Sequence, residues 1–146
     1  MRGYPIDFRV KALKTEMWPG FAEQAGNHVW VGPIQRGLGC FERHLHGEGE
    51  VWLASARDTA DLLVREQRDD GGWEHRFHYP HTFDIEPPWL SGMAQGEGAS
   101  LLTRLHLATG EERWADAARR AVAASVARPS RGPALGARAP VGTGRI

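Results

Sequence analysis

Two pairs of helical segments, each joined by a short glycine-containing turn, constrain the fold of this chain more than any other feature. The clearer pair spans about residues 91–108 and 111–125, and little more than Thr109-Gly110 separates its halves. Glycine suits the position just after a helix, and Glu111 and Glu112 suit the first turn of the next one. A turn this short leaves neighbouring helices antiparallel, so the pattern predicts an αα-hairpin.

The other pair spans about residues 33–46 and 50–67. Before it, residues 1–32 contain scattered proline and glycine residues, which predict extended or looped structure. In both pairs, apolar residues recur at the three- and four-residue spacing of a buried helix face. Two successive hairpins predict a mainly α fold, in which the αα-hairpins form part of an α/α-toroid. The residues expected to face inward are Ile34, Leu38, Phe41, Leu45, Leu53, Ala56, Ala60, Leu63, Val64, Ala94, Leu101, Leu102, Leu105, Trp114, Ala118, Ala121, Val122 and Ser125.

The chain has 146 residues, enough for one domain, and its character changes at residue 128. From there on it carries no acidic residue but four arginines, three prolines and four glycines. Such a segment has too little apolar surface to offset the entropy lost on ordering. We therefore expect a domain over residues 1–127 and a disordered tail over 128–146. A nucleic-acid or membrane arm is the alternative interpretation of the tail.

Charge and composition exclude several classes of protein. The 18 basic and 18 acidic residues balance to a net charge of 0, so there is no overall basic field for a nucleic-acid partner. No apolar run approaches the ~18–20 residues of a membrane span, which argues against membrane insertion. The lone Cys40 precludes an intrachain disulfide and argues against a zinc–thiolate cluster. Because the amino end lacks a signal-peptide core, we expect the chain to be cytoplasmic.

Three stretches of the sequence carry a family resemblance. They are Gly3-Tyr4-Pro5-Ile6-Asp7-Phe8, Gln67 through Trp73, and PWLSGMAQGEGASLL from Pro88 to Leu102. The last is close to a pattern of tryptophan or tyrosine, then SAMAQGQ, then an apolar helix, and RLHLATGEERWADAARRA is similar to the hairpin that follows it. Over roughly residues 3–125, the chain thus resembles the C-terminal domain of the D-glucuronyl 5-epimerases, the heparosan glucuronate epimerases. Residues 67–73 also resemble the glutamine–tryptophan turn of other α/α-toroid enzymes.

The resemblance implies an isomerase that inverts C5 of a uronic acid in an acidic, heparosan-like polysaccharide. Family members share tyrosine-containing stretches farther downstream, which are implicated in proton transfer. This chain has only Tyr4 and Tyr79, and beyond residue 127 it does not resemble the family. We therefore expect an incomplete copy that is weakly active or inactive alone. The alternatives are a non-catalytic α/α module that binds acidic glycans and a truncated product without activity. Because two hairpins leave apolar faces uncovered, we also expect self-association.

Inverting C5 requires a base on one side of the carbon, an acid on the other, and cations or hydrogen-bond donors at the carboxylate. If those donors suffice, no cofactor or metal is needed. Residues 73–89 alternate aromatic and polar groups, end in Pro87-Pro88, and predict a long ordered loop with a short strand. This loop and the start of the following helix offer every group type. We predict catalytic roles for Glu74, His78, Tyr79 and His81, and substrate binding by Trp73, His75, Arg76, Gln95 and Glu97.

Each candidate also has a plain structural interpretation. Trp73 and Phe77 are large aromatic residues that usually pack in a core, and Gln95 could be a buried amide hydrogen-bonded within the fold. Arg76 and Glu74 could form a solvated ion pair. The three-residue spacing of the loop histidines suggests a metal site, but that spacing does not make side chains converge in a non-helical loop. We therefore predict no metal.

Overall fold

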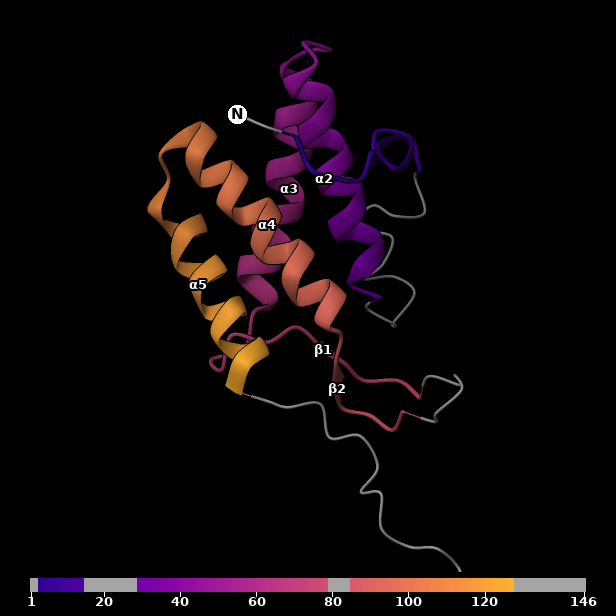
Figure 1. Ribbon diagram of the computed structural model, residues 1–146, viewed down its shortest axis with the longest axis vertical. Helices are drawn as coiled ribbons and strands as arrows, with labels where there is room; N and C mark the ends of the chain where they lie inside the picture. Colours follow the sequence, from indigo (N-terminus) through magenta and orange to yellow (C-terminus); the bar gives the residue numbers. More distant parts are fainter. Residues whose placement is uncertain (1–2, 15–28, 79–84, 128–146) are drawn as a thin grey trace, which may run out of the picture.

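A computed structural model describes residues 3–14, 29–78 and 85–127 of the chain (Figure 1). It is mainly helical, as predicted, and each of the four expected helices begins and ends within about two residues of its predicted bounds. The predicted tail, residues 128–146, lies outside the described residues. The elements in chain order are η1 (Lys11–Leu13), α2 (Val31–Leu45), α3 (Glu50–Glu66), β1 (Glu74–His75), β2 (Trp89–Leu90), α4 (Gly92–Thr109) and α5 (Glu112–Ala127).

The ends of α4 follow from its sequence. The Ser91 hydroxyl accepts a hydrogen bond from the backbone amide of Ala94 at 3.2 Å, which satisfies one of the free amides in the first turn. At the other end, Gly110 takes the left-handed conformation, with φ of 74°, and its amide donates to His106 O at 2.7 Å. This is the helix stop that Thr109-Gly110 predicts.

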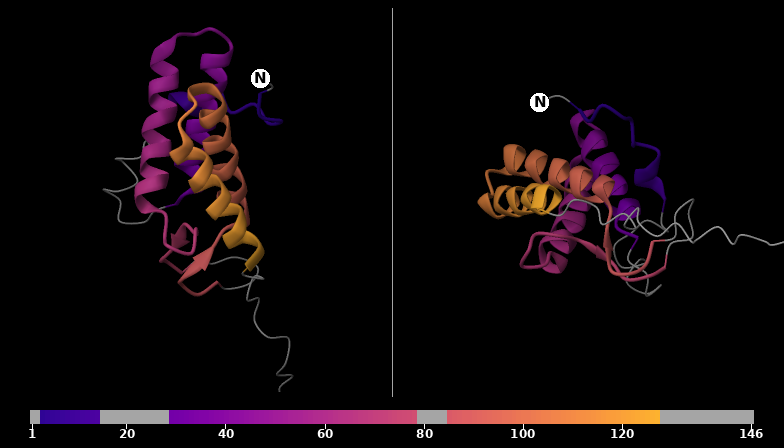
Figure 2. Two further views of the ribbon diagram at one scale, coloured as in Figure 1. Left: turned by 90° about the vertical axis from the view of Figure 1, so that its left-hand side faces the viewer. Right: turned by 60° about the horizontal axis from the view of Figure 1, so that its bottom comes forward.

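The helices pair as two antiparallel hairpins that lie side by side (Figures 1 and 2). One hairpin is α2 with α3, the other is α4 with α5, and α4 packs against both helices of the first hairpin. In this arrangement, α2 and α4 both begin at the end of the molecule that carries β1 and β2 (Figure 1). The expected α/α-toroid stays a prediction, because these two hairpins form one packed pair.

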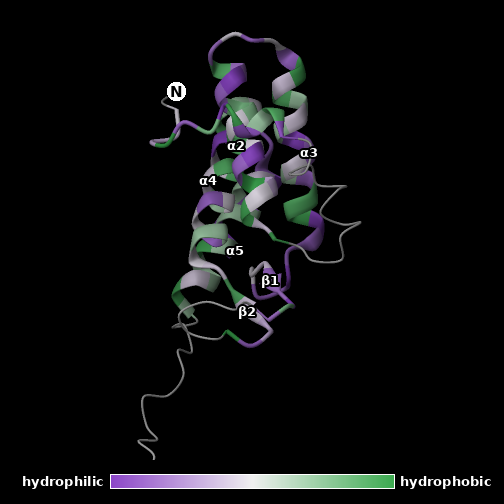
Figure 3. Cartoon of the chain, turned by 90° about the vertical axis from the view of Figure 1, so that its right-hand side faces the viewer, coloured by the Kyte–Doolittle hydropathy of each residue, from purple (hydrophilic) through white to green (hydrophobic). Residues whose placement is uncertain are grey.

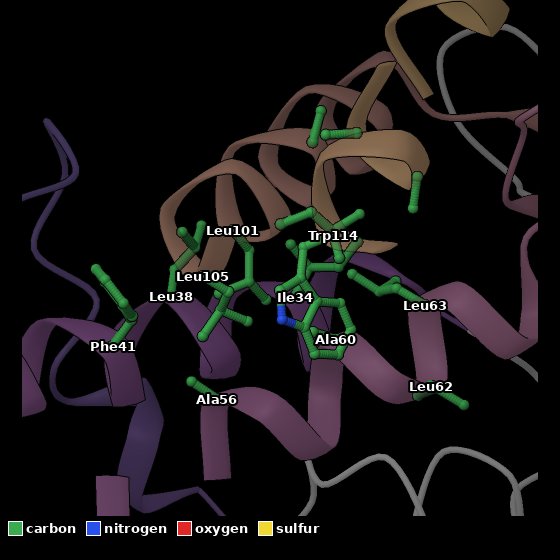
Figure 4. Packing of buried hydrophobic residues seen from close by; sticks show 14 of the residues in the cluster. Ile34, Leu38, Phe41, Ala56, Ala60, Leu62, Leu63, Leu101, Leu105 and Trp114 are labelled. Carbon is green, nitrogen blue, oxygen red and sulfur yellow. The ribbon is translucent and has the colours of Figure 1, made fainter. Parts of the chain in front are cut away.

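The core lies where the two hairpins meet (Figure 4). Ile34 and Leu38 of α2 pack there with Leu63 of α3 and Leu101 of α4, and all four are fully buried. Coloured by hydropathy, each helix carries both apolar and polar residues along its length (Figure 3). On α3 and α5 the buried residues recur at the predicted helical spacing, whereas on α2 every residue from Pro33 to Glu42 is buried, because η1, α3 and α4 all pack against that helix.

Three residues expected inside lie outside. Leu45 and Ser125 are exposed, and Val122 is 54% exposed. Leu45 is the last residue of α2, next to the turn into α3, where no second hairpin covers the helix. On α5 the buried face is a stripe of alanines centred on Ala117 and Ala121, and Val122 lies about 100° around the helix from Ala121.

The turn between α3 and β1 is attached to α5 by one glutamine. The Gln67 amide donates to Gly71 O at 3.1 Å and to Ala117 O at 2.9 Å, while its Oε1 accepts from Arg120 Nη2 at 2.6 Å. The glutamine–tryptophan segment is therefore a structural connection between the two hairpins. Within the described ranges, no helix is long and apolar enough to cross a membrane.

Candidate functional site

A two-stranded ladder stands at the end of the bundle where α2 and α4 begin (Figure 1). β1 and β2 are antiparallel, with Glu74 opposite Leu90 and His75 opposite Trp89. The Trp30 indole, just before α2, donates to the backbone oxygen of Glu74 at 3.0 Å and so attaches the ladder to that helix. Helix N-termini carry partial positive charge, so this end of the molecule suits an anionic ligand.

His75 is the buried residue of the ladder, with 1% of its surface exposed. Its ring stacks on that of Trp89, with centroids 4.0 Å apart and planes 8° apart, and meets the edge of Phe77 at 5.6 Å. Burial lowers the pKa of His75 to about 4, and a hydrogen bond with the Trp89 backbone opposes that shift only in part. At neutral pH the ring is therefore uncharged and turned away from solvent.

The charged face of the ladder carries Glu74 and Arg76. The Glu74 carboxylate forms an ion pair with Arg68, and Oε2 of Glu74 lies 3.6 Å from Arg76 Nε. The Glu74 side chain is almost covered, whereas that of Arg76 is 81% exposed. The predicted ion pair between them thus exists and leaves the Arg76 guanidinium accessible from solvent.

His78 continues this face and meets Glu86, which sequence reasoning did not select. His78 Nε2 lies 3.8 Å from Glu86 Oε1, and the side chains are 47% and 78% exposed, respectively. A histidine beside a carboxylate is a group that can accept and return a proton. Glu86 precedes the proline pair at the far end of the loop, and only the pairing of β1 with β2 brings that end back to His78. Tyr79 and His81, the other predicted catalytic residues, lie outside the described residues.

Trp73 lies in the core, fully buried. Its indole nitrogen donates to Leu63 O at 2.8 Å, and its ring lies against the backbone of α4 at Gly98. A β-carbon at Gly98 would come within 2.6 Å of Trp73 Cζ3, so the glycine makes room for the ring. This geometry therefore supports a packing role for Trp73, which lies beneath the ladder and out of reach of a ligand.

Gln95 and Glu97 are buried on different sides of α4. Gln95 donates to Trp73 O at 3.4 Å, on the ladder side, and its Oε1 has no partner among the described residues. Glu97 accepts from Gln35 of α2 at 3.1 Å. Residues two apart on a helix do not share a face, which explains this separation. The structure therefore does not bring either side chain to the exposed face that carries Arg76 and His78.

Glu97 belongs to a polar cluster that sequence reasoning missed. Lys11 of η1 donates to Gln35, which in turn donates to Glu97. Burial raises the pKa of Glu97, while Gln35 and Lys11 lower it, and burial together with the Glu97 charge raises the pKa of Tyr4. One carboxylate oxygen of Glu97 has no partner among the described residues. These contacts join α2 to α4 and fasten the N-terminal segment over both.

Glu97→Gln is expected to gain stability relative to the wild type as pH rises. Because folding raises the pKa of Glu97, the unfolded chain ionises first as pH rises, and the wild type loses stability relative to the variant above the ordinary carboxyl range. Urea unfolding of both proteins at pH 4.5 and pH 8 measures this difference, and other titrating groups cancel in the comparison. Parallel pH dependences would contradict it.

Among residues 3–14, 29–78 and 85–127, no three histidine, cysteine or acidic side chains lie together as metal ligands would. A shallow groove lies elsewhere, between the outer sides of α4 and α5, and is lined by Thr103, His106, Ala115, Ala118, Arg119 and Val122. The apolar part of this groove is consistent with self-association, which stays a prediction.

Comparisons with known proteins point to one family. The family model described as "D-glucuronyl C5-epimerase C-terminus" matches residues 67–139, half of the chain. The range extends past residue 127, where we expected the resemblance to end. A curated D-glucuronyl C5-epimerase from Caenorhabditis elegans is 37% identical over 67 residues, which cover 44% of this chain and 11% of the relative. The chain thus spans about a tenth of that relative's length. No solved structure matches the chain significantly.

Proposed function

The chain belongs to the D-glucuronyl C5-epimerase C-terminal family, and on that premise we propose that it binds a uronic-acid polysaccharide at its ladder end. The observation that carries this proposal is the exposed Arg76 guanidinium, held beside Glu74 at the end where α2 and α4 begin. A guanidinium can bind a carboxylate through two parallel hydrogen bonds, and the two helix N-termini favour the same charge.

In the proposed reaction, a base takes the proton from C5 of a uronic acid residue. The electron pair of the C5–H bond moves into the carboxylate, and an acid returns one proton to the opposite face of C5, so the proton count is unchanged. We propose that Arg76 stabilises the negative charge that develops on the substrate carboxylate. His78 is then the base that takes the proton, and Glu86 orients its ring. Tyr79 and His81 are our candidates for the opposite face. Glu74 orients Arg76, because its carboxylate is engaged by Arg68 and Arg76.

A second candidate function is binding of an acidic glycan without conversion. His78 Nε2 and Glu86 Oε1 are 3.8 Å apart, so both groups would approach the same side of a sugar ring. Epimerisation needs groups on both sides of C5. This geometry favours a chain that binds the glycan but converts it slowly or not at all. We therefore expect weak or no exchange of the C5 proton by this chain alone.

Arg76→Ala is expected to weaken binding of heparosan oligosaccharides about two- to fivefold, because an exposed charge pair contributes up to about 1 kcal/mol. Titration followed by NMR or calorimetry measures the affinity. The matched control is Arg119→Ala, which removes an equally charged, largely exposed side chain from α5. Equal losses in both variants would show that only net charge matters.

Incubation with heparosan in deuterated water separates the two candidate functions. Label at C5, followed by NMR, supports epimerisation, and its loss in His78→Ala would assign the base. Binding without label supports the non-catalytic module. Absence of both binding and label would contradict the proposed function.

A further inference from the structure

From Trp73 to His78 the side chains alternate between two sides of the chain, and from His75 on the more buried side chains alternate with exposed ones. Trp73 and His75 are buried in the bundle, whereas the side chains of Arg76 and His78 are exposed. Successive side chains of an extended strand point to opposite faces, so the side on which one residue lies determines the side of its neighbours. A change in the face that His75 occupies would therefore move Arg76 and His78 as well.

Two aromatic rings, those of Trp89 and Phe77, hold His75 on its face. The His75 ring stacks on Trp89, its partner across the ladder, at 4.0 Å. Phe77 meets both rings edge-on, with centroids 5.6 Å from each and interplanar angles of 78° and 77°. The Trp89 indole closes the cluster by donating to Phe77 O at 2.9 Å. Each pair has a geometry that aromatic rings prefer.

We propose that His75 is a positioning residue for glycan binding: its ring, held between Trp89 and Phe77, determines that Arg76 and His78 face the ligand. The proposal rests on the proposed function and assigns His75 a role different from substrate contact. A ladder with only two residue pairs is too short to hold its own register, so the ring stack supplies what the backbone lacks.

Burial argues against direct contact between His75 and a glycan. Only 1% of the residue is exposed, and Nδ1 has no partner among the described residues. Its one hydrogen bond, with the Trp89 backbone, lies within the ladder, so toward a ligand the ring contributes only its flat shape. Phenylalanine has a similar flat shape and no polar atom to leave unpaired, which makes His75→Phe the conservative replacement.

The test compares His75→Phe and His75→Ala with the wild type, in heparosan affinity and in the NMR signal of the Trp89 indole N–H. His75→Phe is expected to keep the signal and to bind within about twofold of the wild type. His75→Ala is expected to shift the signal and to lose about as much affinity as Arg76→Ala. His46→Ala, in the turn at the other end of α2, is the matched control and is expected to change neither.

A double-mutant cycle tests whether His75 acts through Arg76. If it does, His75→Ala has little further effect on affinity in the Arg76→Ala background, because the two losses are not additive. Thermal unfolding followed by circular dichroism shows whether His75→Ala has lost the whole fold. If it has, the heparosan affinity of His75→Phe, which is expected to stay folded, decides the test. Additive losses, or a folded His75→Phe that binds as weakly as His75→Ala, would overturn the proposal.

The two proposals can fail separately. If the wild type binds no heparosan, the proposed function fails, and the positioning role is then judged on the ladder itself. Amide exchange of residues 74–76 is expected to accelerate in His75→Ala and to stay slow in His75→Phe. Unchanged exchange and an unshifted Trp89 indole signal in His75→Ala would overturn the positioning role.

Discussion

Trp73→Ala is expected to lower the free energy of unfolding by about 3–5 kcal/mol, the cost of removing a large aromatic side chain from a core. Trp73 is fully buried, donates to Leu63 O, and fills the space opposite Gly98. Its loss leaves a cavity between the end of α3 and the start of α4, which rigid helices close only in part. Urea unfolding at pH 7 measures the difference.

Trp52→Ala is the control for that experiment. Trp52 is only partly buried, on α3, where the Arg43 guanidinium lies 4.9 Å from its ring centroid. The smaller burial predicts a smaller loss, of about 1–2 kcal/mol. If Trp73→Ala cost no more than Trp52→Ala, Trp73 would not be the central packing residue beneath the ladder.

Gly71→Ala is expected to cost about 2–6 kcal/mol for two separate reasons. Gly71 has φ of 85°, a conformation that costs a residue with a β-carbon about 1–3 kcal/mol. In addition, a β-carbon at this position would overlap the backbone oxygen of Arg120 in α5. Forcing the turn away from the helix adds an overpacking cost of about 1–3 kcal/mol and weakens the hydrogen bonds of Gln67.

Gly47→Ala separates these two costs. Gly47 has φ of 75° but nothing within 4 Å of where its β-carbon would be, so it carries the backbone term alone. Unfolding of the two variants under the same conditions should show Gly71→Ala to be the more destabilising. Equal losses would mean that the turn moves freely from α5 and that the Gln67 connection contributes little.

The ladder shows how far local reasoning extends into the site. The alternation of aromatic and polar residues predicted a short strand and placed Glu74, Arg76 and His78 in one functional loop. Local reasoning missed the residues at the other end of the loop, which pair with this strand. Glu86 meets His78, and Trp89 covers His75, only because the two ends of the loop return to each other. Gln95 and Glu97, which were grouped because both lie near the start of one helix, point to different sides of that helix.

By itself, the sequence determined the four helices, the turns between them and most of the buried stripes, because these depend on interactions within a few residues along the chain. It also carried the family resemblance through the segment around MAQG. The tertiary structure decided which polar residues are exposed at the surface and which are buried. Glu97 meets Gln35 across 62 residues, and His75 lies inside because Trp89 stacks on it. Such contacts depend on how two hairpins pack, and packing follows from the shape and burial of the whole core.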